Sequence, residues 1–151
     1  MEHKIFKEKL LGQCREVVEK KIQILQTELS HLTQAKAEDT KSSAGDKYET
    51  GREMVNGEMN KLLGQMSGLK RSLATLNNLP QATSEHVSHG CLVKTQSDWI
   101  YIAISLGQMQ VAKEKILVMS PAAPLAALLM GAKKGDSVNF RDNIYQIITI
   151  C

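Results

Sequence analysis

Two long apolar stripes on either side of a polar segment constrain this chain more than any other feature of its sequence. Before residue 36, apolar residues recur every three or four positions, as in a helix that buries one face: Leu11, Cys14, Val18, Ile22, Leu25, Leu29 and Leu32. After residue 53, the spacing alternates between four and three, as in a coiled coil: Val55, Met59, Leu62, Met66, Leu69, Leu73 and Leu76. The stripes predict two long helices.

The two stripes can be paired position by position. Leu11 pairs with Leu76 and Leu32 with Val55, and the residue numbers of each pair have the same sum. A constant sum is typical of two antiparallel segments, so we expect a helical hairpin that folds back near Ser43. At a rise of roughly 1.5 Å per residue, arms of about thirty residues hold the tip on the order of 45 Å from the base.

The segment between the stripes, KAEDTKSSAGDKYETGRE at 36–53, is polar. We expect the first arm to run from about Lys4 to Ala37 and the second from about Asp46 to residue 77 or 78, with Pro80 as a stop. Four acids crowd the tip: Glu38, Asp39, Asp46 and Glu49. The second arm also contains four glycines, which each cost about 1 kcal/mol of helix propensity, so packing between the arms is expected to carry this helix: Gly51, Gly57, Gly64 and Gly68.

After Pro80 the heptads give way to short β-type runs. The predicted strands are 91–95, 99–105, 116–119, 137–141 and 144–150, the last two joined across Asp142-Asn143. A short apolar helix over 124–130 is predicted to end at Gly131. The expected fold is α+β: an antiparallel coiled-coil hairpin at 1–80, followed by a small antiparallel sheet domain at 81–151 that packs on the hairpin base.

Composition limits the cellular compartment and the classes of partner that can be expected for the chain. No apolar run approaches the roughly 20 residues that span a bilayer, and the first ten residues do not resemble a signal peptide, so a cytoplasmic protein without a membrane partner is expected. The three cysteines form no CxxC pair and are expected to be reduced. The net charge of +3 is mild for a dedicated nucleic-acid binder.

The stretch SPAAPLAALLMGAKKGDSV at 120–138 resembles the C-terminal module of the transcript cleavage factors GreA and GreB. That module has a similar proline-to-glycine helix, then Lys-Lys, Gly-Asp and a closing hairpin on an FKBP-like sheet. Ala123 departs from the family, which often has a capping serine at this position. The resemblance implies partner-binding roles for the residues of this motif: Pro124, Gly131, Lys133, Lys134, Gly135 and Asp136.

The resemblance also implies a function for the tip. Gre hairpins enter the secondary channel of bacterial RNA polymerase, where two tip carboxylates help to hold Mg²⁺ for hydrolysis of backtracked RNA. The family's Gly-Asp-x-x-Glu motif matches Gly45 to Glu49, which makes Asp46 and Glu49 the candidate catalytic and metal-binding residues. Hard carboxylate oxygens suit a second Mg²⁺ in a two-metal site. The chain would be an accessory factor with no cofactor or small-molecule substrate of its own, and the nascent RNA 3′ end would be a second partner.

Two alternatives remain open for the tip. If the alignment with the Gre family is anchored on Tyr48 and Arg52-Glu53 instead, Asp46 and Glu49 no longer align with the family's catalytic carboxylates. The same two acids also have the spacing of a capping box at the start of the second helix.

Other residues suggest weaker hypotheses. His86, His89 and Cys91 are candidate zinc ligands without a fourth partner, and otherwise belong to a strand edge. The aromatic residues could line a prolyl-isomerase-like cleft, although core packing explains them better: Trp99, Tyr101, Phe140 and Tyr145. Basic residues could form a face toward RNA or an acidic polymerase element: Lys113, Lys115, Lys133, Lys134 and Arg141. Three methionines are interpreted as seam filler: Met54, Met59 and Met66.

Two rival functions follow from the same sequence. One is a Rnk-like regulator that occupies the polymerase channel without cleavage. The other is a coiled-coil interaction module unrelated to transcription. No nucleophile-base set or phosphate-binding glycine loop is evident, which disfavours a free-standing enzyme.

Overall fold

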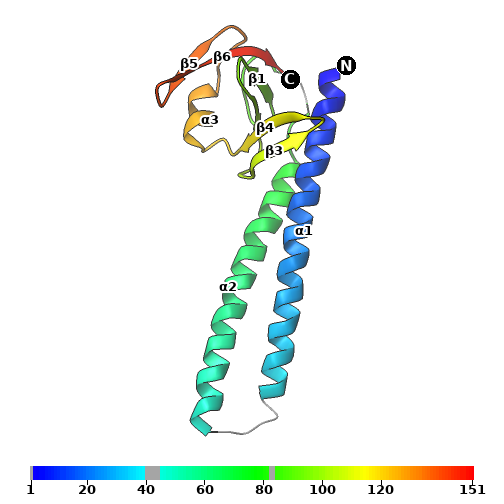
Figure 1. The fold of residues 1–151 in the computed structure, drawn as a ribbon, viewed down its shortest axis with the longest axis vertical. Helices are drawn as coiled ribbons and strands as arrows, with labels where there is room; N and C mark the ends of the chain where they lie inside the picture. Colours follow the sequence, from blue (N-terminus) through cyan, green and yellow to red (C-terminus); the bar gives the residue numbers. More distant parts are fainter. Residues whose placement is uncertain (1, 40–44, 82–83) are drawn as a thin grey trace. The chain divides into compact units, whose positions relative to one another are not determined.

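The computed structural model describes residues 2–39, 45–81 and 84–151, and the side chains of all of these except 39 and 45–50. The elements follow the expected α+β order of two long helices, a small sheet and one short helix (Figure 1). In chain order they are α1 Glu2–Asp39, α2 Gly45–Asn77, β1 Leu92–Thr95, β2 Trp99–Ile102, β3 Gly107–Val111, β4 Glu114–Met119, α3 Pro124–Leu129, β5 Ser137–Phe140 and β6 Asn143–Ile150. The expected fold class is confirmed.

The chain forms two compact units. One contains Met1–Arg15 and Ala74–Cys151, and the other contains Glu16–Leu73. We call them the sheet unit and the arm unit. The division passes through both long helices, so the first turns of α1 and the last turn of α2 belong with the sheet. The domain boundary between residues 80 and 81 stays a prediction.

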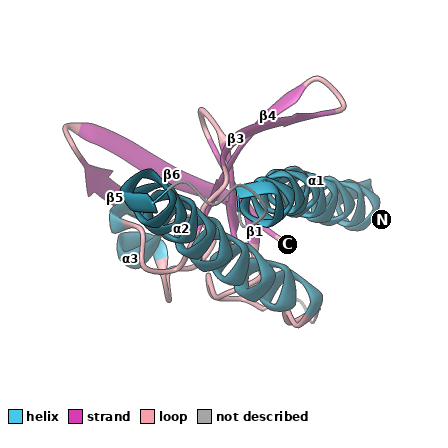
Figure 2. Ribbon diagram, turned by 90° about the horizontal axis from the view of Figure 1, so that it is seen from below, coloured by secondary structure: helices cyan, strands magenta, loops and turns pink. Residues whose placement is uncertain are grey.

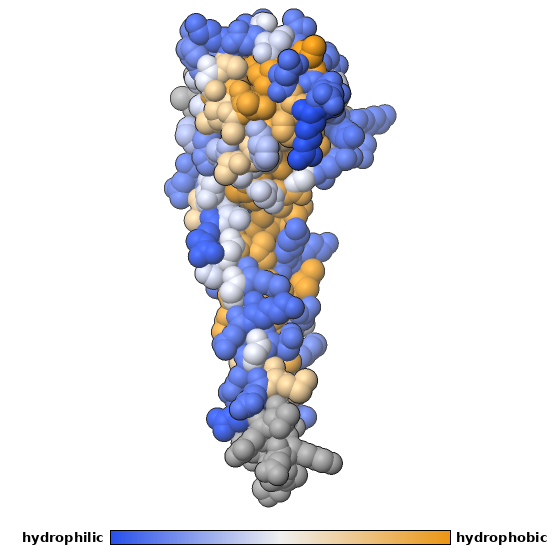
Figure 3. All heavy atoms as spheres, turned by 90° about the vertical axis from the view of Figure 1, so that its left-hand side faces the viewer, coloured by the Kyte–Doolittle hydropathy of each residue, from blue (hydrophilic) through white to orange (hydrophobic). Residues whose placement is uncertain are grey.

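In the arm unit, α1 and α2 run antiparallel (Figure 1). Their predicted stripe is buried in one half of the arms, at Val18, Ile22, Leu62 and Met66. Toward the tip the stripe is only half-buried, at Leu25, Leu29, Leu32, Val55 and Met59. In Figure 3 the apolar surface is likewise broad along the upper part of the arms and interrupted by polar residues lower down. The fully buried seam positions of the arm unit therefore all lie in the half away from the tip, although Leu69 and Leu73 in that half are only half-buried as well.

The sheet has six strands in the order β3-β4-β2-β1-β6-β5. All neighbouring pairs are antiparallel except β2 and β4, which are parallel with Trp99 opposite Ile116. The sequence predicted an all-antiparallel sheet, and this prediction is wrong for the pair β2 and β4. The reason is β3, a strand that the sequence patterns did not indicate: it forms a hairpin with β4 and returns the chain parallel to β2.

The turns of the two outer hairpins have left-handed backbone at non-glycine residues. Ala112 and Lys113 have φ of 50° and 70°, and Arg141 and Asp142 have φ of 48° and 65°. Positive φ at both central residues defines a type I′ turn, which matches the twist of the flanking strands. The β5-β6 turn is thus Arg141-Asp142, one residue earlier than predicted, because Phe140 pairs with Asn143.

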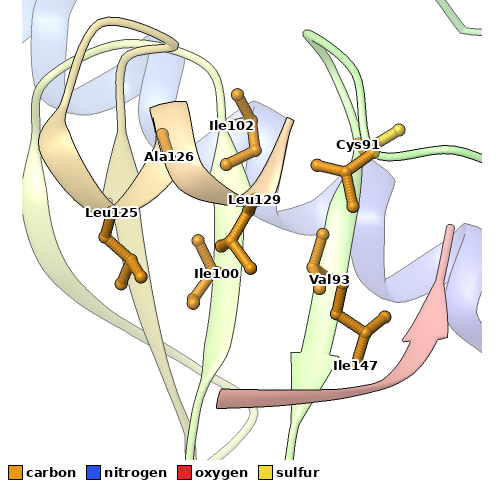
Figure 4. Close-up of a cluster of buried hydrophobic side chains, with 9 residues drawn as sticks. Cys91, Val93, Ile100, Ile102, Leu125, Ala126, Leu129 and Ile147 are labelled. Atoms are coloured by element: carbon orange, nitrogen blue, oxygen red, sulfur yellow. The ribbon is translucent and has the colours of Figure 1, made fainter. Parts of the chain in front are cut away.

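One face of the sheet packs against α3. Leu125, Ala126 and Leu129 of α3 point toward side chains of three strands (Figure 4). The buried cluster consists of Val87, Cys91, Val93, Ile100, Ile102, Leu125, Ala126, Leu129 and Ile147. Ile100 and Ile102 lie on this face, as their alternation along the strand predicts.

The opposite face of the sheet packs against the beginning of α1. Trp99 is 8% exposed and contacts two aromatic rings of α1, with centroid distances of 5.3 Å to Phe6 and 5.7 Å to His3. Further along α1, the Cys14 sulfur lies 3.6 Å from the sulfur of Met109 in β3. The expected packing of the sheet on the hairpin base is therefore found within the sheet unit.

Candidate functional site

The tip residues lie at the beginning of α2. Because α2 starts at Gly45, Asp46 is its second residue and Glu49 its fifth. Their predicted catalytic and metal-binding roles concern side chains, which lie outside the described part of the chain. Residues 40–44, including Ser43 at the predicted fold-back point, also lie outside it.

The backbone bears on the capping alternative. A capping box places its first residue immediately before the helix and its glutamate at the third helical position. With Gly45 already helical, Asp46 lies one residue inside α2 and Glu49 lies beyond the third position. The capping alternative requires a helix that begins at Lys47 instead.

The motif of residues 123–136 forms a compact connection between α3 and β5. Pro124 occupies the first turn of α3, where a missing backbone N–H costs nothing, and Ala123 makes no side-chain cap. Gly131 has a φ of 83° and donates its N–H to the Val87 carbonyl at 2.8 Å. The proline and the glycine therefore start and end the short helix, as the sequence predicts.

The second half of the motif is a turn closed by Asp136. A carboxylate oxygen of Asp136 accepts a hydrogen bond from the Lys133 N–H at 2.9 Å, and the Asp136 N–H donates to the Lys133 carbonyl at 3.0 Å. Gly135, with a φ of 95°, donates to the Ile147 carbonyl at 2.8 Å. These bonds fix the turn on β6 and leave Lys133 and Lys134 exposed. The partner-binding role of the motif stays a prediction.

The candidate basic face does not form as one surface. Lys113 and Lys115 belong to the β3-β4 hairpin at one edge of the sheet, and Arg141 belongs to the β5-β6 hairpin at the other. Figure 2 shows the two hairpins extending from opposite sides of the sheet. The Arg141 guanidinium lies 5.0 Å from the Phe140 ring centroid, a cation-π contact. The hypothesis of a single basic face is not supported, because strand order separates these residues. All five are exposed, as scattered basic residues usually are.

The zinc hypothesis is not supported among the described residues, where no group of three or more His, Cys, Asp and Glu side chains could hold a metal. The three candidates have other neighbours. His89 Nε2 lies 3.0 Å from the Ala103 carbonyl oxygen, while Cys91 Sγ lies 3.3 Å from Ser88 Oγ. His86 forms an isolated backbone bridge with Lys133. These residues tie the start of the sheet together.

The aromatic-cleft hypothesis is also wrong. Phe140 and Tyr145 pack against the α3 cluster, whereas Trp99 packs on α1 from the other face of the sheet. Tyr101 shares the face of Trp99 by strand alternation, and burial raises its pKa. The sheet itself separates the two pairs, so they serve two cores.

The three methionines of the second arm differ in burial. Met66 is buried in the seam and Met59 is half-buried, as seam filler should be. Met54 is 70% exposed, so its interpretation as seam filler was wrong.

One contact was missed by reasoning from the sequence. Lys7 Nζ donates a hydrogen bond to the Cys151 carbonyl oxygen at 3.1 Å, and burial lowers the pKa of Lys7. Burial likewise raises the pKa of Cys151. In the sequence Lys7 is one of several charged residues near the beginning of the chain, and nothing in the local pattern distinguishes it.

No family model and no curated protein matches the chain. Three solved structures are similar to it. The transcription factor Gfh1 shares 17% identity over 90% of this chain and 92% of that one, with a TM-score of 0.38. GreA factor homolog 1 (Gfh1) of Thermus thermophilus shares 16% identity over 91% and 94%, with a TM-score of 0.36. Gfh1 of Thermus aquaticus shares 18% identity over 89% and 92%, with a TM-score of 0.37.

Across the described residues, none of the helices has an apolar stretch long enough to cross a bilayer.

Proposed function

We propose that this chain is a Gre-type transcription factor that binds bacterial RNA polymerase in the cytoplasm and inserts its hairpin tip into the secondary channel. There it stimulates the polymerase to cleave backtracked RNA at the nascent 3′ end. The observation that carries this proposal is the start of α2 at Gly45, which puts the Gly45-Asp46-x-x-Glu49 motif at the beginning of one arm of an antiparallel helical hairpin.

The chemistry proposed for the tip comes from the resemblance to Gre factors, and helix geometry is compatible with it. Residues three positions apart share a helix face, so the carboxylates of Asp46 and Glu49 would approach a common ion. Mg²⁺ takes six oxygen ligands, and two carboxylates supply too few. The polymerase would provide the remaining protein ligands, and its own active site would perform the hydrolysis. The chain is therefore proposed as an accessory factor and not as an enzyme.

The turn that follows α3 is proposed as a second contact with the polymerase. Its backbone is fixed by Asp136 and Gly135, and it presents the exposed side chains of Lys133 and Lys134 on a preorganised loop. Two lysines on a fixed loop suit an acidic partner element.

The test is RNA shortening in a stalled elongation complex, with polymerase binding measured separately. The wild-type chain is expected to bind and to stimulate Mg²⁺-dependent cleavage. Asp46→Asn/Glu49→Gln is expected to bind equally and to lose stimulation, whereas Glu53→Gln, an exposed carboxylate further along α2, serves as the matched control. If the double variant cleaves like the wild type, the tip carboxylates have no role in hydrolysis.

The same experiment separates the rival functions. Binding without any stimulated cleavage identifies the non-cleaving channel regulator. This outcome is favoured by Thr50-Gly51-Arg52-Glu53, which stand where Gre factors usually have Asn-Ala-Glu-Tyr after the tip glutamate. Failure to bind polymerase even at low salt identifies an interaction module outside transcription.

A further inference from the structure

The glycines of α2 are not required by its backbone. Gly51, Gly57, Gly64 and Gly68 all lie within the helix, and none is among the glycines with positive φ. A left-handed conformation, which is the usual reason for a glycine, is therefore excluded at these positions.

Packing does not require them either. A Cβ added at Gly51, Gly57 or Gly64 meets no atom of the described residues within 4 Å, and at Gly68 it meets only the Arg71 guanidinium at 3.8 Å. With 3.6 residues per turn, the glycines at 57, 64 and 68 lie on the side of α2 opposite the buried Leu62 and Met66. Close approach of the two arms thus explains none of these three, and Gly51, which lies on the seam side of the helix, also has open space around it among the described residues.

The opposing arm has a different composition. Between Glu16 and Asp39, α1 contains no glycine, and most of its solvent-facing positions are good helix formers. The low helix propensity is therefore confined to one arm.

Burial does not compensate for the glycines near the tip. The tip half of the seam is only half-buried at Leu32, Val55 and Met59, whereas Leu62 and Met66 are buried. Segments with few buried apolar contacts open at a lower free-energy cost than the rest of a protein. Low helix propensity extends along α2 from Gly51 to Gly68, and between Gly51 and Met59 it coincides with weak burial.

We propose that α2 between Gly51 and Gly68 is a compliant arm, which bends or unwinds locally while the facing part of α1 stays helical. Local bending or unwinding of this kind gives the first turns of α2 more than one accessible position while the two arms stay paired. This inference does not depend on the proposed function, since it concerns the chain in isolation.

The test is native-state amide hydrogen exchange on the full chain, read separately for residues 54–68 of α2 and the facing residues 19–33 of α1. The protection factors of amides at 54–68 are expected to be lower than those at 19–33 by about tenfold or more. In Gly57→Ala/Gly64→Ala, protection at 54–68 is expected to rise by about 25-fold, or about fivefold for each glycine. Equal protection of the two arms in the wild type overturns the proposal.

A matched control distinguishes local from global effects. Gly12→Ala adds a Cβ that also meets no described atom within 4 Å, but in the sheet unit. It is expected to leave exchange at 54–68 unchanged. A rise below about fivefold in the double variant, or an equal rise throughout the sheet, overturns the proposal because the glycines then do not govern local opening of α2.

Discussion

The Phe6 ring of α1 lies against the Trp99 indole of β2, with ring centroids 5.3 Å apart and planes inclined by 44°. Replacing Phe6 by alanine removes this contact from a half-buried site, so we expect the free energy of unfolding to fall by about 1–3 kcal/mol. Urea unfolding followed by fluorescence measures this loss, because Trp99 is the only tryptophan. Ile5→Ala is the matched control: Ile5 is 56% exposed, and its loss is expected to change stability by no more than about 0.5 kcal/mol.

Residues that favour positive φ should stabilise the β3-β4 turn. Ala112 and Lys113 adopt positive φ, which costs an L-residue with a Cβ roughly 1 kcal/mol or more. Ala112→Asn/Lys113→Gly supplies the preferred type I′ pair and is expected to raise the melting temperature by several degrees. Calorimetry tests this, and an unchanged or lower melting temperature would contradict the turn geometry.

Two glycines with nearly the same φ should respond differently to substitution. Gly90 has a φ of 96°, and a Cβ there would lie 2.9 Å from the Pro80 carbonyl oxygen. Gly135 has a φ of 95° and open space around it. Gly135→Ala is expected to cost about 1–2 kcal/mol from backbone strain alone, and Gly90→Ala clearly more because backbone atoms must also shift. Chemical denaturation of both variants compares them, and equal losses would sink the steric argument.

The Cys14 thiol should make stability depend on pH. Burial raises its pKa to about 12, above the ordinary value of 9.0. In the unfolded chain the thiol ionises near its ordinary value, so its stabilising contribution is complete below about pH 9 and is lost as the pH rises toward the folded pKa. The slope of this loss is at most about 1.4 kcal/mol per pH unit.

Cys14→Ala isolates this effect. The difference in unfolding free energy between wild type and variant is expected to be constant from pH 7 to 8 and to shrink by about 1–2 kcal/mol between pH 9 and 10.5. Lys7 and Cys151, whose pKa values burial also shifts, remain in both proteins. Tyr101 remains too; burial raises its pKa, and the Cys14 charge, which the variant lacks, raises it further. A difference that stays constant up to pH 10.5 would mean that the thiol is not protected from solvent.

The sequence was sufficient to predict the elements that depend on local residue patterns. The constant sum of paired stripe positions predicted the antiparallel helices, and the alternation along Trp99 to Ile102 predicted the two faces of the sheet. The helix between Pro124 and Gly131 was also predictable, because both terminal residues act through their own backbone conformation.

Where tertiary context decided the structure, the sequence was misleading. Strand β3 reads as Gly-Gln-Met-Gln-Val and is followed by Ala112-Lys113, a turn without the usual asparagine or glycine, so nothing local marked the hairpin. The parallel pairing of β2 with β4 depends on that missed strand. The cleft and basic-face hypotheses failed because they grouped residues by type, whereas strand order distributes them over different faces and edges. The zinc candidates are neighbours at the start of the sheet, but no group of three or more ligands forms there among the described residues.

Strand β6 lies between β1 and β5, although more than forty residues separate it in sequence from β1. During synthesis the ribosome therefore releases β1 long before the strand that covers its open edge. A nascent chain that stalls before Asn143 would leave that edge unpaired and prone to join another chain. The order of translation thus makes the pairing of β1 with β6 one of the last steps in the formation of this sheet.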